Sequence, residues 1–142
     1  MEILFLVILF ILSFITIKNT PYSLSRAAWH KHLKKQLENN KNSVEITDAM
    51  KGGAILILFA IELFLIIFYT LLGNKIGTTK FIVLSALQVV TCFWNISTNF
   101  SDFKTVFSYN IEDYKFHRFQ LLFNLILDYI YYPLAIYTLL SK

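Results

Sequence analysis

The sequence predicts an all-α integral membrane protein with four transmembrane helices, on the basis of two observations. Hydrophobic residues make up 56% of the 142-residue chain and charged residues only 15%, whereas soluble domains have about 45–50% and about 25%. The apolar residues also gather in four runs suited to cross a bilayer, at residues 3–18, 52–72, 81–98 and 119–140. A chain of this length suits one domain, so we expect residues 1–142 to form a single transmembrane domain.

The first run, residues 3–18, is almost entirely apolar and slightly short for a membrane span, which usually needs about 20 residues. A cleaved signal peptide is the alternative interpretation. Such a peptide begins with Lys or Arg, however, whereas this chain has Glu2, and no small-residue cleavage site follows. We therefore expect a retained helix that ends near Lys18 and Pro21. Because it brings no polar group to the bilayer centre, we expect it to face lipid at the edge of the bundle.

A basic loop, residues 19–50, follows the first run and contains a predicted amphipathic helix at residues 23–37. Trp29, Leu33 and Leu37 recur every four residues and form a narrow apolar stripe. Four cations cover much of the remaining surface, namely Arg26, Lys31, Lys34 and Lys35. The pattern is typical both of a helix that lies on an anionic leaflet and of a helix that is solvated in the cytoplasm.

The second run follows Asp48, whose charge suits a helix amino terminus, and we expect Gly73 and Asn74 to end it. The third run begins only a few residues later, so the second and third helices are expected to be antiparallel neighbours. Residues 99–118 mix charges of both signs with aromatic side chains, which indicates a segment at headgroup level. The fourth run contains Pro133, which membrane helices tolerate as a kink.

Polar side chains recur at helical spacing inside the last three runs. They are Glu62 in the second run, Ser85, Gln88, Cys92 and Asn95 in the third, and Gln120, Asn124 and Asp128 in the fourth. Glu62, Gln88 and Asp128 each lie near the middle of their run, so we expect them at one depth, close to the bilayer centre. Polar groups at this depth are costly and are functional candidates by default. The candidate site therefore consists of Glu62, Gln88, Asn95, Asn124 and Asp128.

Three interpretations of these polar residues remain open. In the first, they hydrogen-bond helices together within one bundle or an oligomer, and each bond contributes about 0.6 kcal/mol. In the second, they line a path for water or ions. In the third, they pair with a basic residue in a partner's transmembrane helix, because no Lys or Arg lies in the middle of any run of this chain.

The positive charges predict an orientation in the membrane. Ten of the 13 Lys and Arg residues lie in the two longer loops, and the other three lie beyond the opposite ends of the runs. Under the positive-inside rule both longer loops are cytoplasmic, or on the matrix side in an organelle. Both termini then lie on the opposite side of the membrane.

The sequence lacks the motifs of several protein classes. It contains no G-x-S-x-G or H-E-x-x-H motif, no Cys/His metal spacing and no glycine-rich phosphate loop, so we expect no enzyme, no metal and no cofactor. No basic and aromatic stretch suits nucleic acid. The single Cys92 excludes an intrachain disulfide.

The function that we expect is helix association in the lipid bilayer. The chain would act as a homo-oligomer or as an accessory subunit of a larger membrane complex, with Glu62, Gln88 and Asp128 as its interaction surface. The alternative is a small ion- or proton-conducting pore, of a holin-like or immunity type.

Overall fold

A computed structural model describes residues 2–41, 48–102, 112 and 114–141. These residues form five helices and no strand: α1 (Glu2–Leu24), α2 (Arg26–Lys41), α3 (Asp48–Ile76), α4 (Thr79–Ser101) and α5 (Arg118–Leu140). All of these except α2 are long and apolar enough to cross a membrane. The predicted all-α fold with four membrane spans is thus confirmed, and the chain is a multi-pass integral membrane protein.

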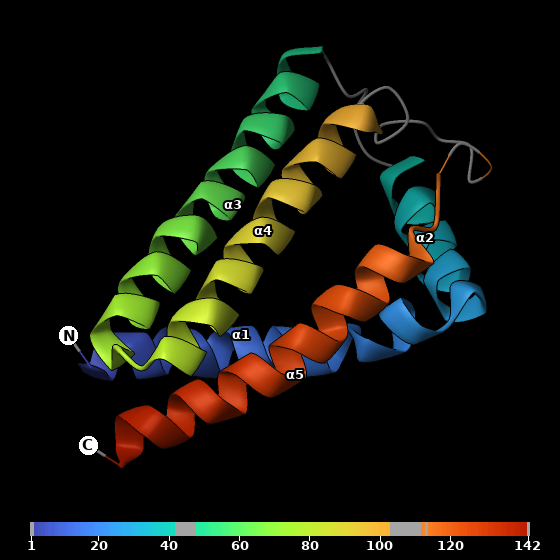
Figure 1. The fold of residues 1–142 in the computed structure, drawn as a ribbon. Coiled ribbons are helices and arrows are strands. Elements are labelled where there is room, and N and C mark those ends of the chain that lie inside the picture. Colours follow the sequence, from blue (N-terminus) through green and yellow to red (C-terminus); the bar gives the residue numbers. More distant parts are fainter. Residues whose placement is uncertain (1, 42–47, 103–111, 113, 142) are drawn as a thin grey trace.

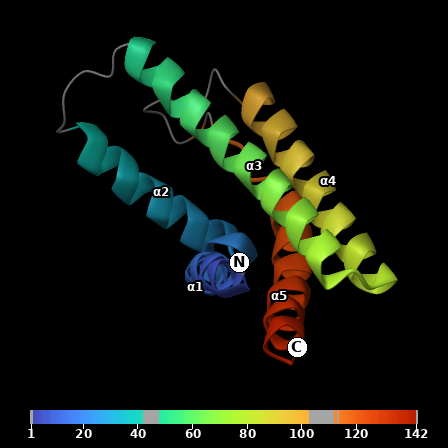
Figure 2. The same cartoon turned by 90° about the vertical axis from the view of Figure 1, so that its left-hand side faces the viewer.

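The four long helices form two antiparallel pairs. The helices α3 and α4 pack along each other and are joined by a short turn, while α1 packs along α5 from the other end of the sequence. Both chain termini lie at one end of the molecule (Figure 1). Figure 2 looks along the axis of α1, and in this view α3 and α4 run obliquely across the picture. The α3–α4 pair is therefore inclined to α1 and does not run beside it. The pairs therefore meet over part of their length only.

The core lies in the half of the molecule that contains the termini. Phe5 and Leu9 of α1 pack there with Phe68 and Leu72 of α3, and the rings of Phe5 and Phe68 are 5.7 Å apart. At this end the Glu2 carboxylate also pairs with the ammonium group of Lys75 at 3.3 Å. Outside the core, most large apolar side chains are exposed. Lipid solvates such a surface, so close packing and hydrogen bonds, rather than water exclusion, hold the helices together.

One prediction about α1 is wrong and another holds in part. The helix continues past Lys18 and Pro21 to Leu24 instead of ending near residue 18. Most of its side chains are exposed, as expected of a helix that faces lipid, but Leu9 is fully buried and Thr16 bonds to α5. Its small polar residues attach one face of α1 to the bundle.

The predicted end of the second span is also wrong. α3 runs through Gly73 and ends at Ile76, and Gly77 follows with φ +74, a left-handed conformation that glycine adopts without strain. Gly73 instead allows a close approach between helices. A β-carbon at Gly73 would lie 2.7 Å from the Ser85 hydroxyl oxygen and 2.8 Å from the Ser85 β-carbon.

The predicted helix in the basic loop is present as α2. Ser25 caps it, because the Ala28 backbone N–H donates to the Ser25 hydroxyl at 3.3 Å. The four predicted basic residues on α2 are all exposed. Trp29 is half-buried and its ring lies 5.3 Å from that of Phe116. Half of the segment predicted at headgroup level (103–111 and 113, out of 99–118) lies outside the described residues.

Replacement of Gly73 should separate α3 from α4. We expect Gly73→Ala to lower the free energy of unfolding by about 1–3 kcal/mol, because the added methyl group overlaps Ser85. Gly53→Ala is the matched control, since a β-carbon at Gly53 meets nothing within 4 Å. It should be neutral or stabilising by up to about 1 kcal/mol. Denaturation in mixed micelles followed by circular dichroism measures both, and equal effects would contradict the close approach.

Candidate intramembrane polar site

Asp128 joins three helices through one carboxyl group. The Gln88 amide on α4 donates to Asp128 Oδ1 at 3.0 Å, and the Thr16 hydroxyl on α1 donates to Asp128 Oδ2 at 3.1 Å. Gln88 is only 2% exposed, and the Thr91 hydroxyl donates to its backbone carbonyl at 2.7 Å. Both oxygens of this acid therefore have donors from the chain itself. We call this group the Asp128 junction.

Tyrosine hydroxyl groups extend the polar contacts toward the termini. The hydroxyls of Tyr69 and Tyr132 are hydrogen-bonded at 2.7 Å, and those of Ser85 and Tyr131 at 2.8 Å. All four side chains are buried. The helical spacing already puts Tyr131 and Tyr132 on the same side of their span as Asp128, but it does not predict which hydroxyl groups they meet. These bonds tie α5 to both helices of the α3–α4 pair.

An amide cluster lies farther toward the loops. The Gln120 and Asn124 side-chain amides of α5 donate to the Asn95 side-chain oxygen on α4, at 2.7 Å and 2.9 Å. The Thr98 hydroxyl donates in turn to the Gln120 side-chain oxygen at 2.9 Å. We call these four residues the amide cluster. It connects the same two helices as the Gln88–Asp128 bond, at a different depth.

Glu62 belongs to the amide-cluster level and not to the Asp128 junction. Its carboxyl group faces Cys92 and Asn95 of α4, and its Oε2 atom is buried without a hydrogen-bond partner among the described residues. Gln88 and Asn95 are seven residues apart, which is about 10 Å along a helix. The structure thus brings together Gln88 with Asp128, and Asn95 with Asn124 and Glu62. Glu62, Gln88 and Asp128 therefore do not meet in one contact, and their common depth in the bilayer stays a prediction.

A polar cavity opens beside the amide cluster, at the loop end of the molecule. Its volume is about 370 Å³, and Glu62, Asn95, Gln120 and Asn124 line it from within. Residues from three different segments line the rest: Trp29, Asp102, Tyr114, Lys115 and His117 among them. The His117 ring nitrogen Nε2 lies 2.6 Å from Asp102 Oδ2. We call this space the loop-side cavity.

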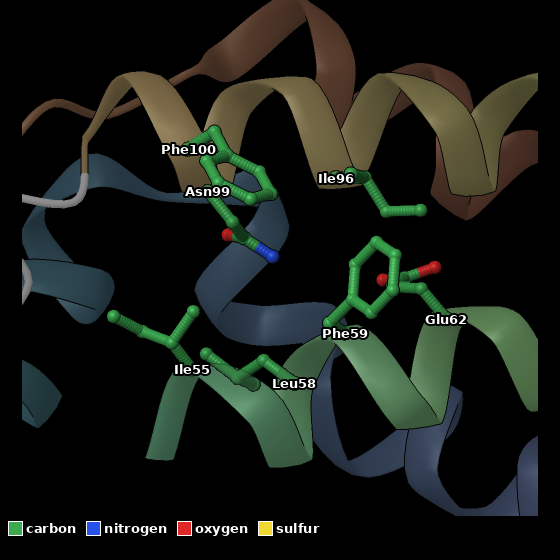
Figure 3. A pocket seen from close by; sticks show the side chains of 7 residues that line it. All are labelled: Ile55, Leu58, Phe59, Glu62, Ile96, Asn99 and Phe100. Atoms are coloured by element: carbon green, nitrogen blue, oxygen red, sulfur yellow. The ribbon is translucent and has the colours of Figure 1, made fainter. Parts of the chain in front are cut away.

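A much smaller recess borders Glu62 on the side of α3. It measures about 20 Å³, which is room for one water-sized group, and lies between Phe59 of α3 and Ile96 of α4. Figure 3 shows the Glu62 side chain reaching from α3 into the space between the two helices, beside the ring of Phe59. Glu62 therefore stands between an apolar recess and the loop-side cavity.

Comparison with known proteins does not assign a family or a function to this site. No protein-family profile, characterised protein or solved structure matches the chain. Within the described part of the chain, no three His, Cys, Asp or Glu side chains lie close enough together to hold a metal ion.

The Asp128 junction should show energetic coupling between α4 and α5. We expect the double variant Gln88→Leu/Asp128→Leu to lose less stability than the two single variants together, by about 0.6 and at most about 2 kcal/mol. Gln88→Leu combined with Thr138→Val is the control, because the Thr138 hydroxyl bonds only to its own helix, at the Leu134 carbonyl. Free energies of unfolding in mixed micelles measure both cycles. Coupling no larger than in the control would show that the bond contributes nothing.

Proposed function

We propose that this chain is a non-enzymatic subunit of a membrane complex, and that a partner's transmembrane helix brings a positively charged side chain to Glu62. The observation that carries the proposal is the buried Glu62 Oε2 atom, which lacks a hydrogen-bond donor within the described residues. The recess beside it has room for one water-sized group, which is the size of an ammonium headgroup.

The other candidate residues bond to one another within the chain, although Asn124 Oδ1 has no hydrogen-bond partner among the described residues. Asp128 accepts two hydrogen bonds and Gln88 supplies one of them. Asn95 accepts two more, from Gln120 and Asn124. Such bonds stabilise one bundle, and they leave few hydrogen-bonding groups that could bind a second chain. The predicted interaction surface therefore narrows from the whole set of polar residues to Glu62.

Electrostatic cost favours a partner of a different kind over a second copy. An ionised carboxylate deep in the bilayer costs about 2.5–3.5 kcal/mol on insertion scales. No span of this chain carries Lys or Arg near its middle, so a second copy offers no cation at the depth of Glu62. A basic residue in a partner's helix carries the same kind of cost. Each charge offsets the other, which makes the association selective.

A pore through a single chain has less support. Toward the termini, buried side chains fill the space between the helices, among them Tyr69, Leu72, Phe81 and Tyr131. The loop-side cavity lies on the other side of this packing. A conducting path would require these rings to separate.

The partner should depend on the charge of Glu62 and not on that of Asp128. We expect Glu62→Gln to keep the fold, because the amide retains the size of the carboxyl group, but to release the partner whose cation is left unpaired. Asp128→Asn is the matched control and should keep the partner, since this acid bonds inside the chain. Gentle extraction followed by native mass spectrometry measures both. A complex that survives Glu62→Gln, or that contains only copies of this chain, would refute the proposal.

The proposal also includes the orientation that the positive charges indicate, with the α2 side in the cytoplasm or matrix. We expect Gln36→Cys, in a Cys92→Ser background, to be protected from an impermeant thiol reagent in intact cells. Ser141→Cys should react, because it lies at the other end of the molecule. Permeabilised cells provide the control, in which both sites should react. Labelling of the Gln36→Cys site in intact cells would reverse the orientation.

A further inference from the structure

We propose that α2 binds the headgroups of anionic phospholipids in the leaflet on the loop side, through Arg26, Lys31, Lys34 and Lys35. The sequence pattern alone leaves two places for this helix, on a leaflet or solvated away from it. The surroundings of α2 in the structure favour the leaflet. This inference goes beyond the proposed function and does not depend on it, because Glu62 belongs to α3 and takes no part in this surface.

The positive charge of this part of the chain is not balanced by nearby acids. Between Glu2 and Glu38 the sequence contains five Lys and Arg residues and no Asp or Glu. The side chains of all five are exposed, and none of them forms an ion pair with another described residue. Lys31, Lys34 and Lys35 are three and four residues apart, so they lie on one face of α2. We call this the basic face.

α2 is held at the end of a membrane span. Only Ser25 separates it from α1, and the Tyr22 ring in the last turn of α1 stacks on the His32 ring, with the ring centres 4.2 Å apart. The apolar run of α1 ends just before Lys18, so the last turns of α1 and the start of α2 lie at the level of the headgroups. Figures 1 and 2 both show that α2 turns away from α1 and runs across its direction. A helix with this start and this direction stays near the membrane surface.

The apolar stripe of α2 and its basic face have different surroundings. Trp29 and Leu33 of the stripe are half-buried, and the Trp29 ring lies 5.3 Å from that of Phe116. Asp102 lines a cavity together with Trp29, but its carboxylate pairs with His117. The stripe is thus partly covered by the protein, whereas the basic face is open to what surrounds the protein.

Anionic headgroups are the partner that fits such a face at this depth. Each Lys or Arg attracts a negatively charged leaflet, and the attraction falls off within a Debye length, which is about 8 Å at physiological ionic strength. A helix with its side chains is only about 10–12 Å wide, so cations on a helix at the headgroups stay close to that range. Their long apolar stems lie along the surface while the charged ends reach phosphate oxygens. Zwitterionic headgroups have no net charge, so the basic face should prefer anionic lipids over them.

The two tryptophans of the chain report on the lipids around two different helices. Trp29 lies on α2, and Trp94 is exposed on the apolar span α4. Nanodiscs would contain a minor share of phosphatidylglycerol in phosphatidylcholine, with bromine as a quencher on the acyl chains of one lipid or the other. In a Trp94→Phe background, we expect Trp29 fluorescence to be quenched at least twofold more, per brominated lipid, when phosphatidylglycerol carries the bromine. Trp94, in a Trp29→Phe background, should be quenched equally by both lipids.

Charge variants test whether the basic face causes this preference. Lys31→Gln, Lys34→Gln and Lys35→Gln together should keep the helix, because these side chains are exposed and Gln has a similar helix propensity. They should lower the quenching ratio of the two lipids to about one. Lys31→Arg, Lys34→Arg and Lys35→Arg together are the matched control and should retain the ratio, since the charge is unchanged. Circular dichroism checks that both variants keep their helices.

Salt and a soluble phosphate complete the test. Raised sodium chloride should lower the ratio for Trp29, because it screens exposed charges. Glycerol phosphate at matched ionic strength should not lower it further, whereas a further loss would indicate a site for free phosphate and contradict the lipid surface. Equal quenching of Trp29 by the two lipids, the same preference at Trp94, or a preference that survives the three Gln substitutions or high salt would overturn the proposal.

Discussion

The carboxyl group of Asp128 is the constraint on which the arrangement of helices depends. In the bilayer core an acid needs hydrogen-bond donors from protein, because water is absent there and the acyl chains have no donors. Asp128 takes one donor from α4 and one from α1, so three helices must approach a single point. That requirement places α1 against α5, although the apolar surface of α1 alone would be equally well solvated by lipid.

The two sides of this junction differ in character. Toward the termini, tyrosine hydroxyls pair with each other and with Ser85 among tightly packed rings, and Gly73 brings α3 close to α4. Toward the loops, the helices are joined by amides around a cavity of about 370 Å³. A groove of about 380 Å³, lined by Gly73 and Ser85, also lies on the side of the termini, but it has no unsatisfied buried acceptor among the described residues. The loop side contains both buried acceptors that the described residues leave unsatisfied, and for this reason it is where a ligand or a second protein has something to contribute.

Much of the fold was predictable, because a membrane span must be apolar over a known length, and all four predicted spans lie within observed helices. The pairing of Gln88 with Asp128, and of Asn95 with Asn124, agrees with the helical spacing of these residues. The contacts of Glu62 were not predictable from the midpoints of the apolar runs. α3 extends over 29 residues, four beyond each predicted end, so Glu62 is still at its middle. A position along one helix does not tell which residues of a neighbouring helix it faces, and Glu62 faces Cys92 and Asn95 rather than Gln88.

Small polar residues were the other source of error. Thr16 looks unremarkable in an apolar run, yet Ser13, Thr16 and Thr20 lie at spacings of three and four, which marks one face of α1. Thr16 and Thr20 bond to α5, to Asp128 and to the Tyr129 hydroxyl. A hydroxyl group can bond to its own helix backbone at little cost, as Ser13 does at Leu9. Sequence alone therefore cannot tell a hydroxyl that bonds locally from one that joins two helices.

The chain lacks hydrogen-bond donors for two buried oxygens, because its own amide donors are used elsewhere. Amides carry donors and an acceptor in one side chain, and here the donors of Gln120 and Asn124 both turn to Asn95. The surplus is therefore on the acceptor side, at Asn124 Oδ1 and Glu62 Oε2. The proposed basic side chain of a partner's helix satisfies this surplus at Glu62 by donating to its carboxyl group. Such a side chain approaches Glu62 laterally, through the recess between α3 and α4.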